Sequence, residues 1–401
     1  MDEKPYFVEL DQAIEISNRI TLQPVVERVP LDDCYNRILA TDSPSLVNDP
    51  PFDNSAMDGF AMRYEDTINP PKDLKIIGTI QAAGQEDNFD VKKGQAVRIM
   101  TGAPMPKGAD AILQVELTST NDDTVTLSQE GMKNFIRRAG ENLKKGELAL
   151  EAGTYLTPSK LGLCATMGYP SLPVVKRLKI AIISTGDELK QPGNDLKRGE
   201  IYESNSFGLS GLVKWLGHEP TRLQCVGDTI GDLRNVLNTA SSNFDLILTS
   251  GGVSMGEWDL VRKIMEEEGD IHFWRIKLRP GSPPLFGLWK DTPIFGLPGN
   301  PVSSHVVFRM LVAPWIRNTT SAKGPSEHKV LAELGTKVKP TKDSLTLRRV
   351  SIELGETGLI AHQKIHQGSG NLASVAFSEG FAILQPKRKY SIGDTVEVLL
   401  I

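Results

Sequence analysis

Residues 178–189, LKIAIISTGDEL, join a near-continuous apolar run to a turn of small and acidic residues. An apolar run without polar alternation is typical of a strand that is buried on both faces, as in a parallel sheet. Helix-like and strand-like segments then alternate up to residue 317: a helical face (Leu209, Leu212, Val213, Leu216), TRLQCVG, IGDLRNVLNTA, DLILTS, EWDLVRKIMEEE, HFWRIKL, TPIFGL and a long helix from Pro301. This order predicts an α/β domain over 177–325, with a parallel sheet covered by helices on both faces.

The segments before and after this domain have a different pattern of apolar and turn-forming residues. Residues 42–141 contain short β-type runs broken by Pro, Gly, Asn and Asp, which predicts an all-β insertion domain. Helical patterns lie on both sides of the insertion, at 10–20 and within 142–176. After about residue 326, alternating β runs with turn residues predict a small C-terminal barrel or sandwich.

Length, charge and missing motifs exclude several classes of protein. The 401 residues exceed one ordinary core, and 45 basic against 50 acidic residues give a formal charge of −5, without the basic surplus that nucleic-acid binding needs. No uncharged run approaches the ~18 residues of a membrane span, and the first ten residues lack the order of a signal peptide. No dinucleotide fingerprint or P-loop motif is present. We therefore expect a soluble, cytoplasmic, multi-domain protein with no nucleic-acid or membrane partner.

Small and acidic residues follow the predicted strands of the α/β domain where each strand ends. Ligands of parallel sheets bind beyond these ends, and glycines there let backbone N–H groups approach an anion. Carboxylates beside such turns indicate a phosphate bridged by Mg²⁺. Helix capping explains any one turn equally well, but three turns at one edge favour a ligand site. The candidates are Ser184, Thr185, Gly186 and Glu188 after the first strand, Asp228 after the second, and Ser250, Gly251, Gly252, Ser254 and Asp259 after the third.

Basic residues recur at every second position between 275 and 279. Alternation along a strand would place Arg275, Lys277 and Arg279 on one face, where three like charges favour an oxyanion ligand. A solvated edge strand is the alternative interpretation. Asp58 and Thr101 of the insertion lie in turn-rich stretches and, by themselves, are ordinary turn residues.

Six motifs, in order along the chain, resemble those of the MoeA family, the molybdopterin molybdenumtransferases, which are similar to the E domain of gephyrin. They span essentially the whole sequence: AMDGFAM (56–62), RIMTGAPMPKGADAI (98–112), STGDEL (184–189), ESNS (203–206), TSGGVSMGEWD (249–259) and GLPGNPVSS (296–304). The resemblance implies four parts: an elongated N-terminal region (here 1–41 plus 142–176), a β insertion domain (42–141), a molybdopterin-binding α/β domain (177–325) and a C-terminal β-barrel (326–401). It also implies a homodimer, in which the α/β domain of one protomer faces parts of the other across the cleft.

The resemblance further implies the reaction. The enzyme would insert molybdate into adenylylated molybdopterin and release AMP with the help of Mg²⁺, in molybdenum cofactor biosynthesis, with a molybdopterin adenylyltransferase as a further partner. Matched by motif, Glu188 and Asp228 would bind the metal, and Asp259 would serve the same site. Asp58 and Thr101 would come from the insertion to close the cleft. Further substrate contacts implied by the resemblance are Pro298, Asn300, Pro301, Arg349 and Ser369.

Three positions depart from the family pattern. Ser282 stands where the family's Lys-Pro-Gly-Lys-Pro loop has its second lysine, Asn142 replaces a carboxylate, and Ser344 replaces an arginine. These changes lie on the side expected to hold the oxyanion, where Arg275 and Arg279 keep positive charge without the point-charge geometry of lysine. The alternatives are a tungstate-inserting homologue, a divergent pterin-binding or scaffold paralogue, and adenylylation from ATP by the α/β domain.

Overall fold

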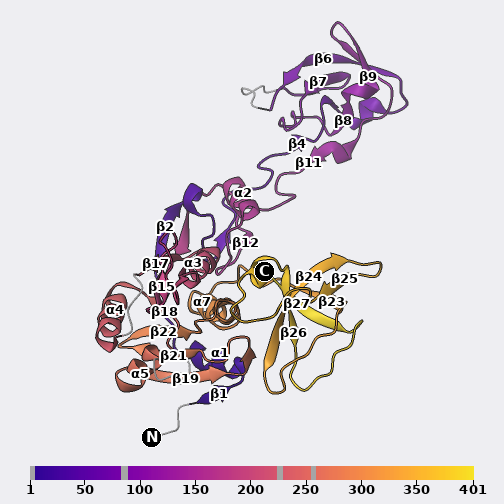
Figure 1. Ribbon diagram of the computed structural model, residues 1–401. Coiled ribbons are helices and arrows are strands. Elements are labelled where there is room, and N and C mark those ends of the chain that lie inside the picture. Colours follow the sequence, from indigo (N-terminus) through magenta and orange to yellow (C-terminus); the bar gives the residue numbers. More distant parts are fainter. Residues whose placement is uncertain (1–4, 83–88, 224–228, 254–258) are drawn as a thin grey trace.

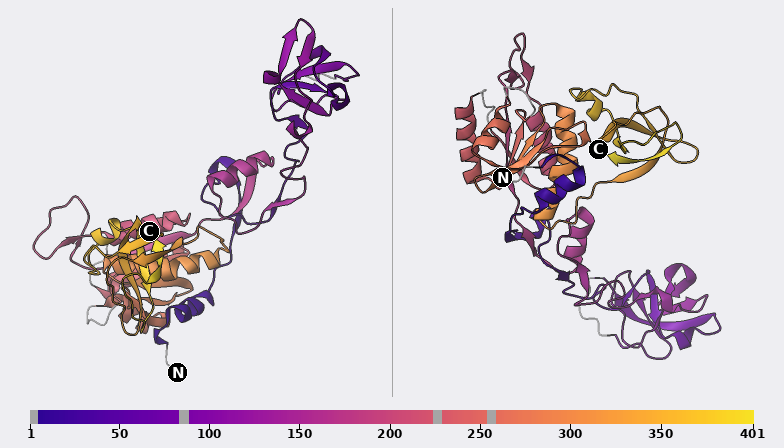
Figure 2. Two further views of the ribbon diagram at one scale, coloured as in Figure 1. Left: turned by 90° about the vertical axis from the view of Figure 1, so that its right-hand side faces the viewer. Right: turned by 90° about the horizontal axis from the view of Figure 1, so that it is seen from below.

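The computed structural model describes residues 5–82, 89–223, 229–253 and 259–401. The molecule is elongated: an α/β domain and a β-barrel form its body, and the insertion lies apart from them at the end of a narrow connecting region (Figure 1). Two further views show the same separation (Figure 2). The multi-part fold class expected from the sequence is confirmed. Within the described residues, no helix is long and apolar enough to span a membrane.

A seven-stranded sheet forms the centre of the α/β domain. Its strands lie in the order β1-β19-β21-β22-β18-β14-β17. Their bounds are β1 Tyr6–Val8, β14 Lys179–Ser184, β17 Glu219–Arg222, β18 Leu246–Ser250, β19 Asp270–Ile276, β21 Leu285–Trp289 and β22 Thr292–Leu297. Leading out of β14, a short parallel pair, β15 (Leu189–Lys190) and β16 (Ile201–Tyr202), forms the base of a projecting loop.

The prediction of an all-parallel sheet is wrong for one strand. β21 runs antiparallel to both of its neighbours, β19 and β22. Only a two-residue turn, residues 290–291, separates β21 from β22, because Trp289 pairs with Thr292. A connection this short makes a hairpin, whereas a parallel crossover needs a dozen residues or more. The sequence pattern does not reveal β1, an edge strand near the N-terminus that pairs in parallel with β19.

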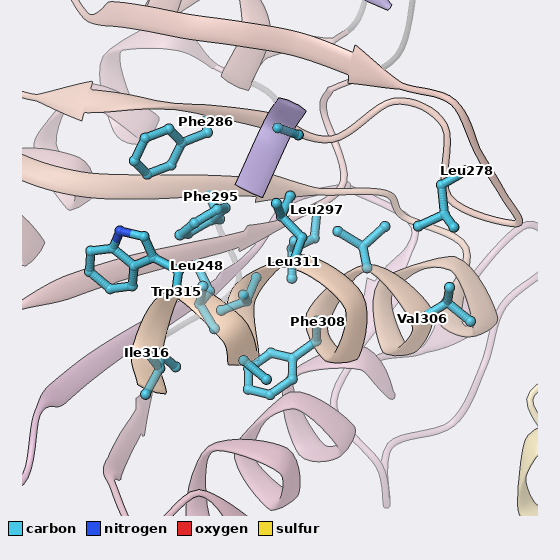
Figure 3. Close-up of a cluster of buried hydrophobic side chains, with 14 of the residues drawn as sticks. Leu248, Leu278, Phe286, Phe295, Leu297, Val306, Phe308, Leu311, Trp315 and Ile316 are labelled. Carbon is cyan, nitrogen blue, oxygen red and sulfur yellow. The ribbon is translucent and has the colours of Figure 1, made fainter. Parts of the chain in front are cut away.

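Helices cover both faces of the sheet, as the apolar strands predict. One face packs against α1 (Leu10–Asn18), α3 (Asn205–Trp215) and the C-terminal helical segment, and the other against α4 (Ile230–Asn243) and α5 (Leu260–Glu267). The C-terminal segment comprises α6 (Pro301–Val307), a π-helical turn (Phe308–Val312) and α7 (Ala313–Thr319). Figure 3 shows its packing, in which Trp315 meets Phe295 edge-on with ring centroids 5.7 Å apart. This closely packed apolar layer holds the strands in place, and with them the strand ends that line the site.

The connecting region consists of chain from both sides of the insertion. β2 (Val26–Pro30) pairs with β13 (Ser171–Val175), and β3 (Ser43–Pro44) pairs with β12 (Leu148–Leu150). Together with α2 (Pro158–Thr166) they enclose a small core. The insertion is all-β, as predicted, with a six-stranded sheet: β5 Gly59–Met62, β6 Lys72–Ile80, β7 Gln95–Ile99, β8 Ala111–Gln114, β9 Thr118–Asn121 and β10 Thr124–Leu127. β4 (Asn54–Ser55) and β11 (Ile136–Arg137) pair where it joins the connecting region.

The C-terminal part is a closed barrel. The strands follow the ring β24-β25-β23-β27-β26, and β26 pairs back with β24. Their bounds are β23 Lys329–Leu334, β24 Leu345–Leu354, β25 Leu359–His362, β26 Gly380–Leu384 and β27 Thr395–Leu400, with the short helix α8 at Ala373–Ala376. A two-residue strand, β20 (Leu278–Arg279), extends from the α/β domain and pairs with β24. The barrel is thereby attached directly to the edge of the α/β domain.

Candidate functional site

A cavity of about 710 Å³ lies where strands β14 and β18 end side by side. Ser184 pairs with Ser250 at these two ends. From β14 the chain crosses to β17 on one side and then returns to β18 on the other. Such a switch point opens a crevice beyond the carboxyl ends of the strands, where open α/β sheets bind their ligands. The cavity therefore lies where the sequence predicts a site.

Most of the candidate residues of the α/β domain line this cavity together. The loops after β14 and β18 converge there, and the N-terminus of α6 closes another side. Asp228 and Ser254 lie outside the described residues. The candidates that line the cavity are Ser184, Thr185, Gly186, Glu188, Ser250, Gly251, Gly252, Asp259, Pro298, Asn300 and Pro301.

The glycines of the two loops are required by local geometry. Gly251 and Gly252 adopt φ of 101° and 67°, in the left-handed region, and a Cβ on Gly251 would lie 2.9 Å from Thr185 Oγ1. Gly186 has φ of 137°, and a Cβ there would lie 2.5 Å from Glu188 Oε2. The Glu188 carboxylate thus folds back over its own turn, against Gly186.

A buried carboxylate, Glu203, was missed as a functional candidate although it lies in the quoted ESNS segment. Glu203 is 2% exposed and lines the cavity. Its carboxylate accepts hydrogen bonds from Ser184 Oγ (3.0 Å), Ser206 N (2.7 Å) and Ser206 Oγ (2.5 Å). Two of these donors belong to the first turn of α3, where a negative charge is favoured. Glu203 therefore joins the end of β14 to the start of α3.

Asn205, two positions after Glu203, holds the same corner together. Its side-chain amide donates to Ser250 Oγ at 2.7 Å and to the Gly299 carbonyl at 2.7 Å. The first helical residue of α3 is thus bound to the end of β18 and to the loop after β22. The floor of the cavity is fixed by hydrogen bonds across three strands, as a site that must hold a ligand in one orientation requires.

The charge of the cavity is negative. Glu188, Glu203 and Asp259 line it, whereas no Lys, Arg or His is present among its described lining residues. No group of three His, Cys, Asp or Glu side chains in the described chain is arranged to hold a metal ion by itself. Mg²⁺ does not need such a cage, because it commonly takes one or two carboxylates, keeps waters and binds substrate phosphates. Glu188 and Asp259 fit that mode of binding.

The barrel contributes a loop to the rim of the cavity. Gly370 and Leu372 line it, and Val302 N at the start of α6 donates to the Ser369 carbonyl at 3.2 Å. Arg349 supports this loop from inside the barrel, since it is 1% exposed and donates to Gly368 O at 3.1 Å and to Ser374 Oγ at 3.1 Å. Burial lowers the pKa of its guanidinium to about 10. In this structure Arg349 bonds to the protein loop and does not line the cavity.

Comparison with known proteins identifies the family. Residues 8–168 match the MoeA N-terminal region (domain I and II), 181–318 match a probable molybdopterin binding domain, and 332–401 match the MoeA C-terminal region (domain IV). A molybdopterin molybdenumtransferase of Haemophilus influenzae is 36% identical to this chain, and the match covers 97% of both chains. The chain belongs to the MoeA family. It is an enzyme of the molybdopterin molybdenumtransferase type, with a role in molybdenum cofactor biosynthesis.

Two more relatives cover the full length of this MoeA-family chain. The molybdopterin molybdenumtransferase of Bacillus subtilis is 33% identical over 100% of this chain and 96% of its own. A solved molybdopterin biosynthesis MoeA protein of Pyrococcus horikoshii matches with a TM-score of 0.84 at 28% identity, covering 98% of this chain and 100% of that one. The four-part arrangement is therefore that of the MoeA family.

None of the three basic residues expected on one strand face lines the cavity in this MoeA-family chain. β19 ends at Ile276, and Arg275 just before this end has a φ of 67°. Arg275 donates to the Tyr6 hydroxyl at 2.8 Å, and Lys277 pairs with Glu9 at 2.6 Å. Both lie against the N-terminal strand and helix and do not line the cavity, and Arg279 in β20 does not line it either. The structure thus places Arg275 and Lys277 together beside Phe7 and brings none of the three basic residues to the cavity.

The residues at the three positions that depart from the family pattern make hydrogen bonds within the protein. Ser282 is buried, and its hydroxyl donates to the Ile276 carbonyl at 3.1 Å, so its side chain closes its own loop. Asn142 donates to Asp49 at 3.2 Å. The Ser344 side chain is buried, and its carbonyl accepts from Thr346 Oγ1 at 3.1 Å. None of the three residues lines the cavity.

Asp58 and Thr101 form a pair on the insertion. Thr101 donates to Asp58 Oδ1 from its backbone N–H at 2.6 Å and from its hydroxyl at 2.9 Å. These two bonds hold the pKa of the Asp58 carboxyl below its usual value. The pair is exposed, and the insertion that carries it lies far from the cavity of the same chain (Figure 1). The structure thus separates two groups of residues that the family resemblance assigns to one site.

Proposed function

We propose that this enzyme inserts molybdate into adenylylated molybdopterin and releases AMP with the help of Mg²⁺. The observation that supports the proposal most is the charge of the cavity: three carboxylates and no cationic side chain among its described lining residues. A diphosphate could not bind there without a cation to offset the repulsion. Backbone N–H groups at the glycine turns and the carboxylates together suit a metal-bound diphosphate.

The residues that line the cavity would have different roles. Glu188 and Asp259, with Asp228 as a ligand predicted from the sequence, would hold Mg²⁺. When bound, Mg²⁺ neutralises charge on the diphosphate and polarises its P–O bonds. The turn at Gly251 and Gly252 would orient a phosphate oxygen, and the Ser184–Glu203–Asn205 corner would keep the floor rigid. Pro298, Asn300 and Pro301 would shape the wall beside the pterin.

Cofactor formation tests this function. We expect the purified enzyme, given adenylylated molybdopterin, molybdate and Mg²⁺, to produce a cofactor that activates a molybdenum enzyme prepared without it. Removing Mg²⁺ with a chelator should abolish the activation, because the carboxylates would then repel the diphosphate, and adding Mg²⁺ back should restore it. Activation that persists undiminished in the chelator would contradict the metal-dependent site.

A homodimer would unite the cavity with the insertion. We propose that Asp58 and Thr101 of one protomer serve the cavity of the partner, since the same chain keeps them apart (Figure 1). In a twofold dimer any contact between the insertion of one protomer and the cavity of its partner occurs twice, so both sites would be completed in the same way. The cytoplasmic location, the adenylyltransferase partner and the choice of molybdate over tungstate stay predictions from the sequence.

Mixing two inactive variants tests the shared site. Asp58→Asn and Glu188→Gln should each be inactive alone, whereas subunit exchange should restore about a quarter of the unaltered activity, because half of the dimers would carry one intact site of two. The measurement is AMP release before and after exchange. A control mixture of Glu188→Gln with Asp259→Asn should stay inactive, as both changes fall in the same cavity. If the first mixture also stays inactive after verified exchange, the site is not shared.

A further inference from the structure

The turn that follows β18 is held by bonds to two other elements of the α/β domain. Gly251 N donates to the Leu297 carbonyl at the end of β22 at 3.0 Å, and the Gly252 carbonyl accepts from Arg262 N in α5 at 3.0 Å. Both glycines line the cavity. Because both bonds join backbone groups, substitution of a side chain removes neither of them.

The last residue of this turn is held by a side chain. Val253 follows the two glycines and lines the cavity, and its carbonyl accepts a hydrogen bond from the indole Nε1 of Trp274 at 3.0 Å. The indole N–H is the single donor of a tryptophan side chain. Val253 is 2% exposed, so its carbonyl depends on a donor from the protein, and a buried acceptor without a donor is costly.

Contacts on the indole ring of Trp274 fix the direction of its N–H group. Tyr6 of β1 is the register partner of Trp274 in β19, and the centroids of the two rings lie 5.3 Å apart. The guanidinium carbon of Arg262 lies 4.8 Å from the centroid of the Trp274 ring, a cation–π contact. Arg262 is also the residue whose backbone N–H binds Gly252. The ring, the start of α5 and the glycine turn therefore hold one another in place.

We propose that Trp274 is a positioning residue of the enzyme, which keeps the turn at Gly251 and Gly252 in the orientation that a metal-bound diphosphate requires. This inference rests on the proposed function. Trp274 does not line the cavity, so it acts through its bond to Val253 and not by touching the substrate. Partners that orient a metal site without binding the metal typically cost about ten- to a hundredfold in metal affinity or activity when they are removed.

Replacing Trp274 by phenylalanine tests this role, because an aromatic ring remains against Tyr6 while the N–H donor is lost. We expect the Mg²⁺ concentration that gives the half-maximal rate of AMP release to rise about tenfold in Trp274→Phe. Trp289→Phe is the matched control. Trp289 is 3% exposed, its Nε1 donates to Asn238 Oδ1 at 3.1 Å, and it does not line the cavity. This control should lower the Tm and leave the Mg²⁺ requirement unchanged.

Hydrogen–deuterium exchange measures the turn itself and needs no turnover. The Gly251 N–H is bonded to the Leu297 carbonyl, so its exchange reports how often the turn opens. In Trp274→Phe this exchange should be about tenfold faster than in the unaltered enzyme, because the Val253 carbonyl loses its donor and the closed turn is favoured less. In Trp289→Phe the exchange rate of this amide should not change.

Two results would overturn the positioning role. One is exchange of the Gly251 amide at the unaltered rate in Trp274→Phe. The other is faster exchange together with the same Mg²⁺ requirement as in Trp289→Phe, since the indole would then stabilise the turn without serving the reaction. If the unaltered enzyme releases no AMP with Mg²⁺, the proposed function fails, which is a different result, and exchange alone then decides whether Trp274 holds the turn.

Discussion

Replacing Glu188 by glutamine should lower the rate of AMP release about a hundredfold or more. The change keeps the shape of the side chain and removes its charge, so the turn over Gly186 should survive while the cavity loses a metal-binding oxygen. Losses of this size are typical when one group that stabilises charge in the transition state is removed. The measurement is the AMP-release rate at saturating substrate, repeated over a range of Mg²⁺ concentrations.

The dependence on Mg²⁺ separates a metal ligand from a structural residue. In Glu188→Gln the Mg²⁺ concentration for half-maximal rate should rise at least about tenfold, as the loss of a group that supports a metal site does. Glu200→Gln is the matched control, because this glutamate lies at the end of the adjoining projecting loop, pairs with Lys190 at 3.4 Å and does not line the cavity. An equal loss of rate in both variants would argue against a metal-binding role for Glu188.

Replacing Glu203 by alanine should destabilise the α/β domain by about 3 kcal/mol, because three hydrogen-bond donors in a buried corner lose their acceptor. For a domain of this size that corresponds to a fall in Tm of roughly 6–12 °C, measured by circular dichroism or calorimetry. AMP release should fall with it even below the unfolding transition, since Ser184 and the start of α3 would no longer be held together.

The matched control for Glu203 is again Glu200, replaced by alanine. It pairs with Lys190 at 3.4 Å on the projecting loop, and ion pairs at the surface contribute less than about 1 kcal/mol. Equal shifts in Tm for both variants would mean that the loop as a whole, and not the buried corner, determines stability. An unchanged Tm in Glu203→Ala would remove the structural role assigned to this carboxylate.

The sequence predicts the architecture well where its patterns are long. The apolar run at 179–184 forms β14, and the helix expected from Pro301 begins there as α6, with proline at its first position. β21 was missed because LFGLW is short and follows two prolines, so nothing in its pattern shows that a hairpin replaces a helical crossover. The direction of β21 is set by the short turn at 290–291. The hydrophobic periodicity of the sequence does not report strand direction.

The candidate site was predicted in part for the same reason. The turns after β14 and β18 meet because the two strands are parallel neighbours in one sheet. The order of the motifs along the chain already indicates this meeting. Arg275 and Lys277 were expected to hold an oxyanion, but the N-terminal segment supplies Tyr6 and Glu9 as their partners, which the local pattern does not reveal. Glu203 was not singled out because its role depends on burial against Ser184, 19 positions away, and no local pattern records that contact.

The most direct measurement of the central claim is AMP release from adenylylated molybdopterin by the unaltered enzyme with Mg²⁺. It would be run with molybdate, with tungstate and with neither oxyanion. The proposed function predicts release that depends on the oxyanion and on Mg²⁺, with the faster oxyanion identifying the natural one. Tight binding of the substrate without release under any of these conditions would contradict it, and the chain would then be a pterin-binding member of the family without this turnover.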